Sequence, residues 1–344
     1  MSKSYYIIPI FVPHEGCPHN CVFCNQNRIT GSTEIVTAQT VYNTIDEYLK
    51  TIVRKDYTTI EVSFFGGTFT AIEEEKQREL LTVAKKYKDE GLIDKIRMST
   101  RPDYIDDYIL SYLKTYEVDI IELGVQSLVD EVLVASGRGH TKDDVVNASR
   151  LIKEYGFTLG HQIMPGLPKD NFERDIETAL ESIKMKPDIC RTYPALIICD
   201  TPMEEMYRRK QYIPYTLDEA VSICARMYKL YKDADVNVIR MGLQPTETIT
   251  EGKDIIEGPF HPAFRELVEG YSISAKIKED LKKEKSGTLY INPKDLSKLY
   301  ANKKIYFNKL LGEGYSISVV VSDKIERNNI LIKSGDDNEK EDKR

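Results

Sequence analysis

Near its start the chain carries the stretch Gly16-Cys17-Pro18-His19-Asn20-Cys21-Val22-Phe23-Cys24-Asn25. It follows residues 5–12, an apolar and β-branched run of the length of a buried strand. Three of the six cysteines lie in this loop and can converge on one metal centre. Structural zinc takes four ligands, and His14 or His19 is the candidate for the fourth. A 4Fe–4S cluster held by three cysteines instead leaves one iron free to bind a small molecule.

Downstream of the loop, short apolar runs alternate with amphipathic stretches. The predicted strands are residues 5–12, 58–65, 95–100, 118–125, 157–164 and 188–196, with a candidate last strand at 236–241. The predicted helices are 37–55, with Thr37 as N-cap, 71–88, 104–116, a segment around Leu128, 142–155, 172–184, 202–210 and 217–232. Six strand–helix units in succession imply an α/β fold of parallel strands joined by right-handed crossovers. A (β/α)6 barrel or part of one fits this length, and a doubly wound open sheet is the structural alternative.

The pattern changes after about residue 250. A helix is predicted at 261–284, a strand at 288–292, a Lys-rich helix at 293–311, and strands at 315–321 and 329–333. We therefore predict a core domain at 1–250, a small α+β C-terminal accessory domain at 251–333, and a disordered charged tail at 334–344.

The composition is that of a globular protein, with 41% hydrophobic and 30% charged residues in 344. No apolar run is long enough to cross a membrane, and the N-terminus lacks the pattern of a secretory signal, so we expect a cytoplasmic protein. Thiols in that compartment are reduced, and Cys190, Cys199 and Cys224, among apolar neighbours, are expected to be inert. The net charge is −7, yet residues 271–333 hold 13 basic and 7 acidic side chains.

The CxxxCxxC spacing with an aromatic residue before the last cysteine is specific, and on it the chain resembles the radical S-adenosylmethionine (SAM) superfamily. The resemblance implies that Cys17, Cys21 and Cys24 bind a 4Fe–4S cluster whose open iron binds SAM. It implies a TIM-barrel-like partial (β/α)6 barrel. The cofactors would supply a 5′-deoxyadenosyl radical, with electrons from a donor such as flavodoxin or ferredoxin. No residue is assigned as catalytic.

The same resemblance implies roles for residues at the ends of the predicted strands. Gly66, Gly67 and Thr68 match the segment that binds the methionine amino group, and Phe23 matches the aromatic residue against the adenine. The candidates to contact the ribose and carboxylate of SAM are Gln126, Arg138 and Gln162, and Ser99 is expected to line the pocket. Each has a plain alternative, because Gly-Gly is often a simple turn, a glutamine often caps backbone and an arginine often lies on the surface.

Further segments narrow the resemblance to the radical domain of the Elongator catalytic subunit and its bacterial relatives. They are Ser99-Thr100-Arg101-Pro102-Asp103, Glu122-Leu123-Gly124-Val125-Gln126-Ser127, Gly137-Arg138-Gly139-His140, His161-Gln162-Ile163-Met164-Pro165-Gly166-Leu167-Pro168 and Tyr193-Pro194-Ala195-Leu196. This likeness implies a tRNA or other RNA substrate. Oxygen-independent coproporphyrinogen oxidases share some of these segments, so a small-molecule substrate is the alternative, and a non-catalytic zinc module is another.

Two features depart from the Elongator pattern. We expect no acetyltransferase domain in this chain, and the cysteine spacing is shorter than in that subunit, so the reaction is expected to differ even where the scaffold agrees. A candidate RNA contact is the stretch 293–311, in which lysines could attract phosphates and aromatic rings could stack on bases. Its members are Lys294, Lys298, Lys303, Lys304, Lys309, Tyr300, Tyr306 and Phe307. The alternative is a solvated amphipathic helix whose aromatic residues pack on the barrel.

Overall fold

The computed structural model describes residues 4–12, 15–25, 28, 35–245, 249–250 and 252–334. His14, one of the two candidates for a fourth zinc ligand, lies outside these residues. So does the charged tail after Ser334, for which disorder was predicted.

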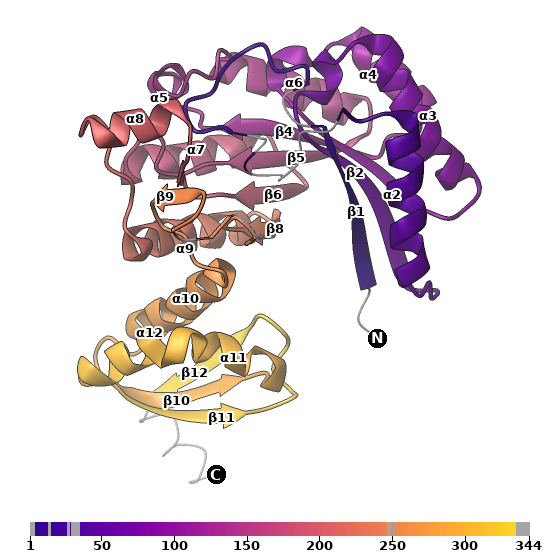
Figure 1. The fold of residues 1–344 in the computed structure, drawn as a ribbon. Helices are drawn as coiled ribbons and strands as arrows, with labels where there is room; N and C mark the ends of the chain where they lie inside the picture. The colour runs from indigo at the N-terminus through magenta and orange to yellow at the C-terminus, as the bar shows by residue number, and fades with distance from the viewer. Residues whose placement is uncertain are drawn as a thin grey trace.

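The main sheet has seven parallel strands in the order β1-β2-β3-β4-β5-β6-β8 and curls into a half-barrel (Figure 1). Its strands are β1 (Ser4–Val12), β2 (Thr58–Gly66), β3 (Lys95–Thr100), β4 (Ile120–Gln126), β5 (Thr158–Ile163), β6 (Ile189–Thr192) and β8 (Asn237–Met241). Each strand of this sheet pairs with the strand of the same sheet that precedes it in the sequence. Successive right-handed crossovers therefore place the helices on the same face. A doubly wound sheet would reverse the strand order part-way. The partial barrel is therefore confirmed, with residues 236–241 contributing a seventh strand.

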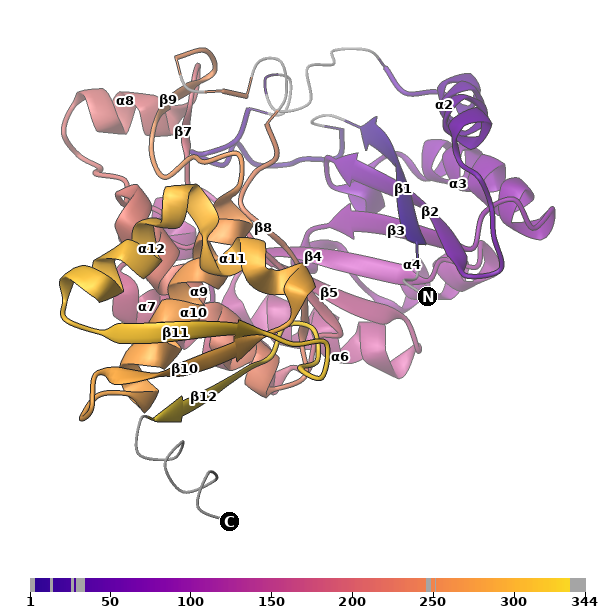
Figure 2. The same ribbon diagram turned by 90° about the horizontal axis from the view of Figure 1, so that it is seen from below.

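Helices cover the convex face of the half-barrel (Figure 2). They are α2 (Ala38–Thr51), α3 (Glu74–Asp89), α4 (Asp107–Thr115), α5 (Asp130–Ala135), α6 (Lys142–Glu154), α7 (Phe172–Lys184) and α9 (Leu217–Asp233). Thr37 caps α2 as predicted, in a reciprocal capping box with Thr40. The core lies between helices and sheet, where Val41 and Ile45 of α2 join Ile8 and Val62 in one buried cluster.

The other face of each strand is concave and carries polar side chains. Successive side chains of a strand point to opposite faces, so residues between the core positions point into the half-barrel. On β2, for example, Ile60 and Val62 belong to the core while Glu61 and Ser63 lie on the concave face. The same alternation places Arg97 of β3 on that face.

Further short elements lie at the carboxyl ends of the strands. β7 (Ile197–Ile198) pairs with β9 (Ile255–Glu257), and α8 (Pro202–Arg208) follows β7. A single strand over 188–196 was predicted, but β6 ends at Thr192, and the chain then passes through Pro194, which has no N–H to donate to a ladder. Within the described ranges, no helix is both long and apolar enough to cross a membrane.

The C-terminal part packs beneath the half-barrel through α10 (Phe264–Asp280), which contacts α9 and α12 (Figure 1). Its sheet has the order β11-β10-β12, with β10 (Ser286–Ile291) parallel to β11 (Ser316–Val321) and antiparallel to β12 (Ile330–Ser334).

One prediction in this part is wrong: residues 293–311 do not form a single helix. A 3₁₀ turn (Pro293–Asp295) leads into α11 (Leu296–Leu299) and then α12 (Ala301–Gly312). Asn302, Lys303 and Lys304 have left-handed φ values of 45°, 55° and 66°, which break the helical path.

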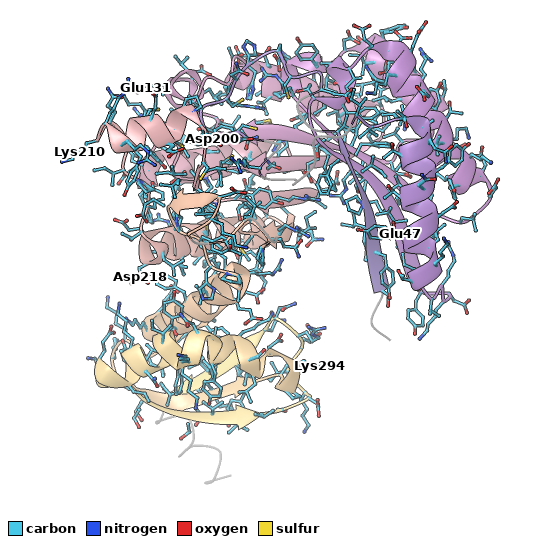
Figure 3. All side chains as sticks on the ribbon, viewed as in Figure 1. Glu47, Glu131, Asp200, Lys210, Asp218 and Lys294 are labelled. Atoms are coloured by element: carbon cyan, nitrogen blue, oxygen red, sulfur yellow. The ribbon has the colours of Figure 1, made fainter. Side chains whose placement is uncertain are left out.

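The aromatic side chains of this segment face the interior. Tyr306 meets Tyr271 of α10 edge-on, with ring centroids 5.5 Å apart, and Tyr300 meets Phe307 in the same way at 5.4 Å. The packing interpretation of these rings is therefore the one that the structure supports. The lysine side chains Lys294, Lys303 and Lys309 are exposed, and Lys294 lies on the C-terminal part (Figure 3).

Candidate active site

The cysteine loop begins at β1 and is locked against the end of β2 by two glycines. Thr68 donates its backbone N–H to the carbonyl of Glu15 at 3.0 Å. A Cβ on Gly67 would lie 2.2 Å from the Glu15 carbonyl oxygen, and a Cβ on Gly16 would lie 2.4 Å from the Thr68 carbonyl oxygen. Both positions therefore exclude a side chain, and Gly16 also has a φ of +71°. The Gly66-Gly67-Thr68 segment thus fixes the base of the cysteine loop.

From this base the loop crosses the carboxyl ends of the strands. The N–H of Val22 donates to the carbonyl of Ser136, between α5 and α6, at 3.0 Å, and the carbonyl of Val22 accepts from Met203 of α8 at 2.9 Å. The loop therefore spans the mouth of the half-barrel, where parallel-strand enzymes place their active sites.

Beyond the cysteines, a second set of contacts ties the loop to the β7–β9 pair. The Asn25 amide donates to the carbonyl of Cys199 at 3.2 Å, and Arg28 forms ion pairs with Asp200 at 2.7 Å and Asp254 at 3.4 Å. Asp200 lies beside α8, on the side of the molecule that carries Lys210 (Figure 3). These partners are far apart in sequence, so spacing alone did not reveal them.

Each cysteine of the loop has a different environment. Cys17 Sγ lies 3.4 Å from the Thr68 hydroxyl, Cys21 is buried, and the N–H of Cys24 donates to the carbonyl of Cys21 at 3.0 Å. In the part of the chain described here, no three His, Cys, Asp or Glu side chains are grouped as ligands of a single metal ion. His19 packs on the backbone of Gly139, where a Cβ would lie 2.4 Å from its Nε2.

Arg138 brings a positive charge to the buried cysteine. Its Nη1 donates to Cys21 Sγ at 3.4 Å, its Nη2 donates to the carbonyl of Gly124, and its Nε is buried without a partner among the described residues. A Cβ on Gly124 would lie 3.0 Å from Nη2, so the glycine leaves room for the guanidinium. A cation at a buried sulfur and an orphaned N–H are what an anionic thiolate-bound group requires, so these residues fit an iron–sulfur cluster.

The two glutamines predicted from the resemblance meet at the same mouth. Gln162 Nε2 lies 3.4 Å from Gln126 Oε1, and the carbonyl of Gln126 accepts from the N–H of Met164 at 2.8 Å. Gln126 has a φ of +66°, unusual for a residue other than glycine, at an irregularity in the β4–β5 pairing. Such strain concentrates at functional sites, although tertiary packing maintains it.

Phe23 and Ser99 have different surroundings from each other. Phe23 is buried in an apolar cluster that also holds Cys21, Leu167 and Met203. Ser99 lies on the concave face, with its hydroxyl 3.4 Å from Glu122 Oε1. Phe23 therefore lies with the cysteines, whereas Ser99 belongs to the polar interior of the half-barrel.

The floor of the half-barrel holds a buried ionic network that the sequence patterns did not identify. Arg97 Nε lies 2.7 Å from Glu61 Oε1, and its Nη1 lies 3.2 Å from Glu122 Oε2, which also receives Arg191 Nε at 3.0 Å. These four residues come from β2, β3, β4 and β6 and are at most 6% exposed. Charged residues at alternate strand positions look like solvent-facing residues in a sequence; here they are buried on the concave face of the half-barrel.

The three remaining cysteines lie outside the cysteine loop and have protonated thiols. Burial raises the pKa of Cys190 to about 12 and raises that of Cys224 well above its ordinary value. Cys199 is half-buried, and its pKa is raised by burial and by Glu204 and Asp254. Thiols held protonated in this way are poor nucleophiles and poor ligands, and the inert role of these three cysteines stays a prediction.

The chain is similar in sequence and in fold to several known proteins. The chain is 29% identical over 256 residues to the tRNA uridine(34) acetyltransferase of Methanocaldococcus jannaschii, covering 63% of this chain and 47% of that protein. It is 30% identical over 215 residues to human Elongator complex protein 3, covering 54% of this chain and 39% of that protein. The chain thus spans about half or less of the length of these relatives. Among solved structures, Methanocaldococcus infernus Elp3 with an N-terminal deletion superposes with a TM-score of 0.64 at 23% identity, covering 80% of this chain and 64% of that one.

The family itself is shown by two family models that match consecutive parts of the chain. Residues 187–272 match the radical SAM C-terminal domain. Residues 11–183, which are half of the chain and include the cysteine loop and the carboxyl ends of β1 to β5, match the radical SAM superfamily. With the cysteine loop across the mouth of a partial parallel barrel, the chain belongs to the radical SAM superfamily of enzymes.

Proposed function

We propose that this protein holds a 4Fe–4S cluster with Cys17, Cys21 and Cys24, cleaves SAM, and uses the resulting 5′-deoxyadenosyl radical to modify RNA, with tRNA as the expected class. The observation that carries the first part is the anchoring of the three-cysteine loop across the strand ends, with Arg138 at the buried Cys21. When bound, the cluster and SAM would supply the radical, and the chain would bind and shield them.

The residues around the mouth have distinct expected tasks. Arg138 would balance the negative charge of the thiolates from one side. Gly66, Gly67 and Thr68 would offer backbone groups to the methionine part of SAM, and the Gln126–Gln162 pair would present amide groups to its polar atoms. Ser99 would line the pocket, and Phe23 would support the adenine side from the apolar cluster.

The RNA part of the proposal rests on the relatives and on local charge. The matched acetyltransferase acts on tRNA uridine 34 by its name. Residues 271–333 hold an excess of basic side chains, and several lysines there are exposed. We also propose a cytoplasmic location, a flavodoxin- or ferredoxin-type electron donor, and a functional division near residue 250 between the core and the accessory part.

The cluster assignment is tested by six single alanine variants, one for each cysteine. We expect Cys17→Ala, Cys21→Ala and Cys24→Ala to lose bound iron and sulfide after anaerobic reconstitution, because each thiolate holds one iron. Cys190→Ala, Cys199→Ala and Cys224→Ala are the matched controls and should retain iron near the wild-type content. Full iron and sulfide content in Cys21→Ala would refute the assignment.

The substrate assignment needs its own experiment. Reduced, reconstituted protein is incubated anaerobically with labelled SAM and total cell RNA, and the digested nucleosides are analysed by mass spectrometry. A new modified nucleoside that forms with wild type and not with Cys21→Ala supports the proposal. SAM cleavage without any change in RNA would favour a small-molecule substrate.

A further inference from the structure

Two arginines lie side by side on the concave face, at the β6–β8 edge of the half-barrel. Arg191 of β6 is in register with Arg240 of β8. Partners in register on parallel strands are roughly 5 Å apart and point to the same face of a sheet. Arg191 lies on the concave face, where its Nε forms an ion pair with Glu122 of the buried network. The β6–β8 pairing has an irregularity just before Arg191, and beyond it Arg191 pairs with Arg240 and Thr192 with Met241, which belongs to the core, so Arg240 projects to the concave face as well.

Among the described residues, this edge holds more positive than negative side chains. Arg97 and Arg191 share Glu122, and Glu61 is occupied by Arg97. Arg240 donates from Nη1 to the neutral amide oxygen of Gln244 at 2.7 Å, and no Asp or Glu of the described residues forms an ion pair with it. Among the described residues, three guanidinium groups and two carboxylates therefore lie at this edge. Like charges on directly paired strand positions destabilise a sheet, so this arrangement has a cost that an anion would remove.

The neighbouring groups suit an oxyanion. Tyr193 follows Arg191 by two residues, and its hydroxyl accepts from Arg191 Nη1 at 3.4 Å. Burial raises the pKa of Tyr193, so the hydroxyl keeps its proton and can donate it in a hydrogen bond. The Arg191 guanidinium lies over the ring of Phe65 at 5.0 Å from its centroid, which fixes the plane of the fork.

We infer that Arg191, Tyr193 and Arg240 bind a phosphate group of the substrate on the concave face. Guanidinium groups bind phosphate through two parallel hydrogen bonds, and a protonated tyrosine adds a third donor. This inference rests on the proposed function, in which the substrate is RNA and its phosphodiester is the oxyanion. The carboxylate of SAM has the same chemistry, so the experiment must separate the two sources.

The first experiment tests the site without RNA. The melting temperature of the reconstituted full chain is measured with and without inorganic pyrophosphate for wild type, Arg240→Gln, Arg240→Lys and the control Arg209→Gln. Arg209 is an exposed residue after α8 that pairs with Glu205.

Pyrophosphate should stabilise wild type and the control, because a ligand that binds only the folded state raises its stability. Arg240→Gln should lose that response and, without ligand, should melt no lower than wild type, since one unbalanced charge is gone. Arg240→Lys should keep part of the response. A wild-type response in Arg240→Gln would overturn the site.

The second experiment identifies the source of the oxyanion. Affinities for a tRNA transcript and for SAM are measured separately at several salt concentrations. Arg240→Gln should weaken RNA binding about tenfold and reduce the salt slope by about one, while leaving the SAM affinity unchanged.

A loss of SAM affinity with unchanged RNA affinity would overturn the inference and assign the oxyanion to the cofactor. If pyrophosphate raises the melting temperature of wild type but not of Arg240→Gln, and wild type binds no RNA, the RNA substrate is refuted while the phosphate contact stands. The two failures are therefore distinguishable.

Discussion

Arg138 Nη1 donates a hydrogen bond to the sulfur of Cys21 at 3.4 Å, although the two residues are 117 positions apart in the sequence. The contact joins the cysteine loop after β1 to the turn between α5 and α6. Gly124 of β4 makes it possible, because a side chain there would meet the guanidinium. The loop after β1, strand β4 and the turn between α5 and α6 thus all contribute to the surroundings of one cysteine.

This relationship predicts the effect of removing the cation. In Arg138→Gln the negative charge of a thiolate-bound cluster would have no buried positive partner, so the cluster should be lost more readily. We expect iron to be removed by a chelator several-fold faster than from wild type. The measurement is the decay of visible absorbance after adding chelator under anaerobic conditions. Arg150→Gln, which removes an exposed arginine of α6 paired with Glu154, is the control and should behave as wild type. Equal rates in all three proteins would contradict the role.

The close approach of Gly67 and Glu15 leads to a second prediction. A Cβ at Gly67 would lie 2.2 Å from one backbone oxygen and 2.8 Å from that of Val12, so the start of the cysteine loop must shift. We expect Gly67→Ala to lose about 1–3 kcal/mol of stability, as overpacked positions do, and to bind less iron after reconstitution.

The matched control is Gly312→Ala, because Gly312 lies in α12, where an added Cβ would meet no neighbouring atom within 4 Å. There the change should be neutral or stabilising by about 0.5–1 kcal/mol. Urea unfolding and iron assays give both numbers. If Gly67→Ala kept full stability and iron but lost only SAM affinity, the segment would serve the cofactor and not the loop.

Much of the core fold follows from periodic patterns. The strands at β2 and β3 and the start of α2 at Thr37 were predicted to within a residue or two, because each depends on local alternation or a cap. The order of strands in the sheet depends on tertiary contacts, so the choice between a half-barrel and a doubly wound sheet needed the structure.

The site was predictable where chemistry is concentrated in one segment and less so where it is spread over the chain. Cys17, Cys21 and Cys24 stand in one loop, and their spacing alone indicated a metal centre. The contacts of Arg28 with Asp200 and Asp254 and the alignment of Arg191 with Arg240 arise from residues far apart in sequence. Residues Asn302–Lys304 have left-handed φ values although none of them is a glycine. The sequence therefore carried no signal of a break, and a continuous helix was predicted.

The exposed lysines of the C-terminal part give a third prediction, in which one variant changes only surface charge and another changes only packing. Lys303 and Lys304 are exposed, whereas Tyr306 packs edge-on against Tyr271. If RNA contacts this surface, the double change of Lys303 and Lys304 to Glu should weaken tRNA binding and lower its salt dependence, with little effect on unfolding.

Tyr306→Ala serves as the contrasting variant. Because Tyr306 is only half-buried, this change should destabilise the fold by less than the ~3–5 kcal/mol that truncation of a fully buried aromatic residue costs, and it should leave the salt dependence of any remaining binding unchanged. Filter binding with a tRNA transcript and urea unfolding are the measurements. Unaltered affinity in the double lysine variant would place the RNA contact elsewhere.

The last prediction concerns acid stability and His161. This histidine is buried between the hydroxyls of Ser149, 3.0 Å from Nε2, and Ser182, 2.8 Å from Nδ1. Burial lowers its pKa from 6.5 to about 3. Between these two values the unfolded chain binds a proton that the folded protein does not, so stability falls as the pH is lowered from 6.5 towards 3, by up to about 1.4 kcal/mol per pH unit from this group. Above pH 6.5 the contribution of this group to stability is fully present.

His161→Gln should therefore show a shallower loss of unfolding free energy with acid than wild type, whatever its stability at neutral pH. Ser182→Ala removes one hydrogen bond without removing the titrating group, so it should be less stable at every pH and keep the wild-type slope. Urea unfolding at several pH values in this range measures the slopes, and an identical slope in His161→Gln and wild type would show that His161 is not the group that couples folding to pH.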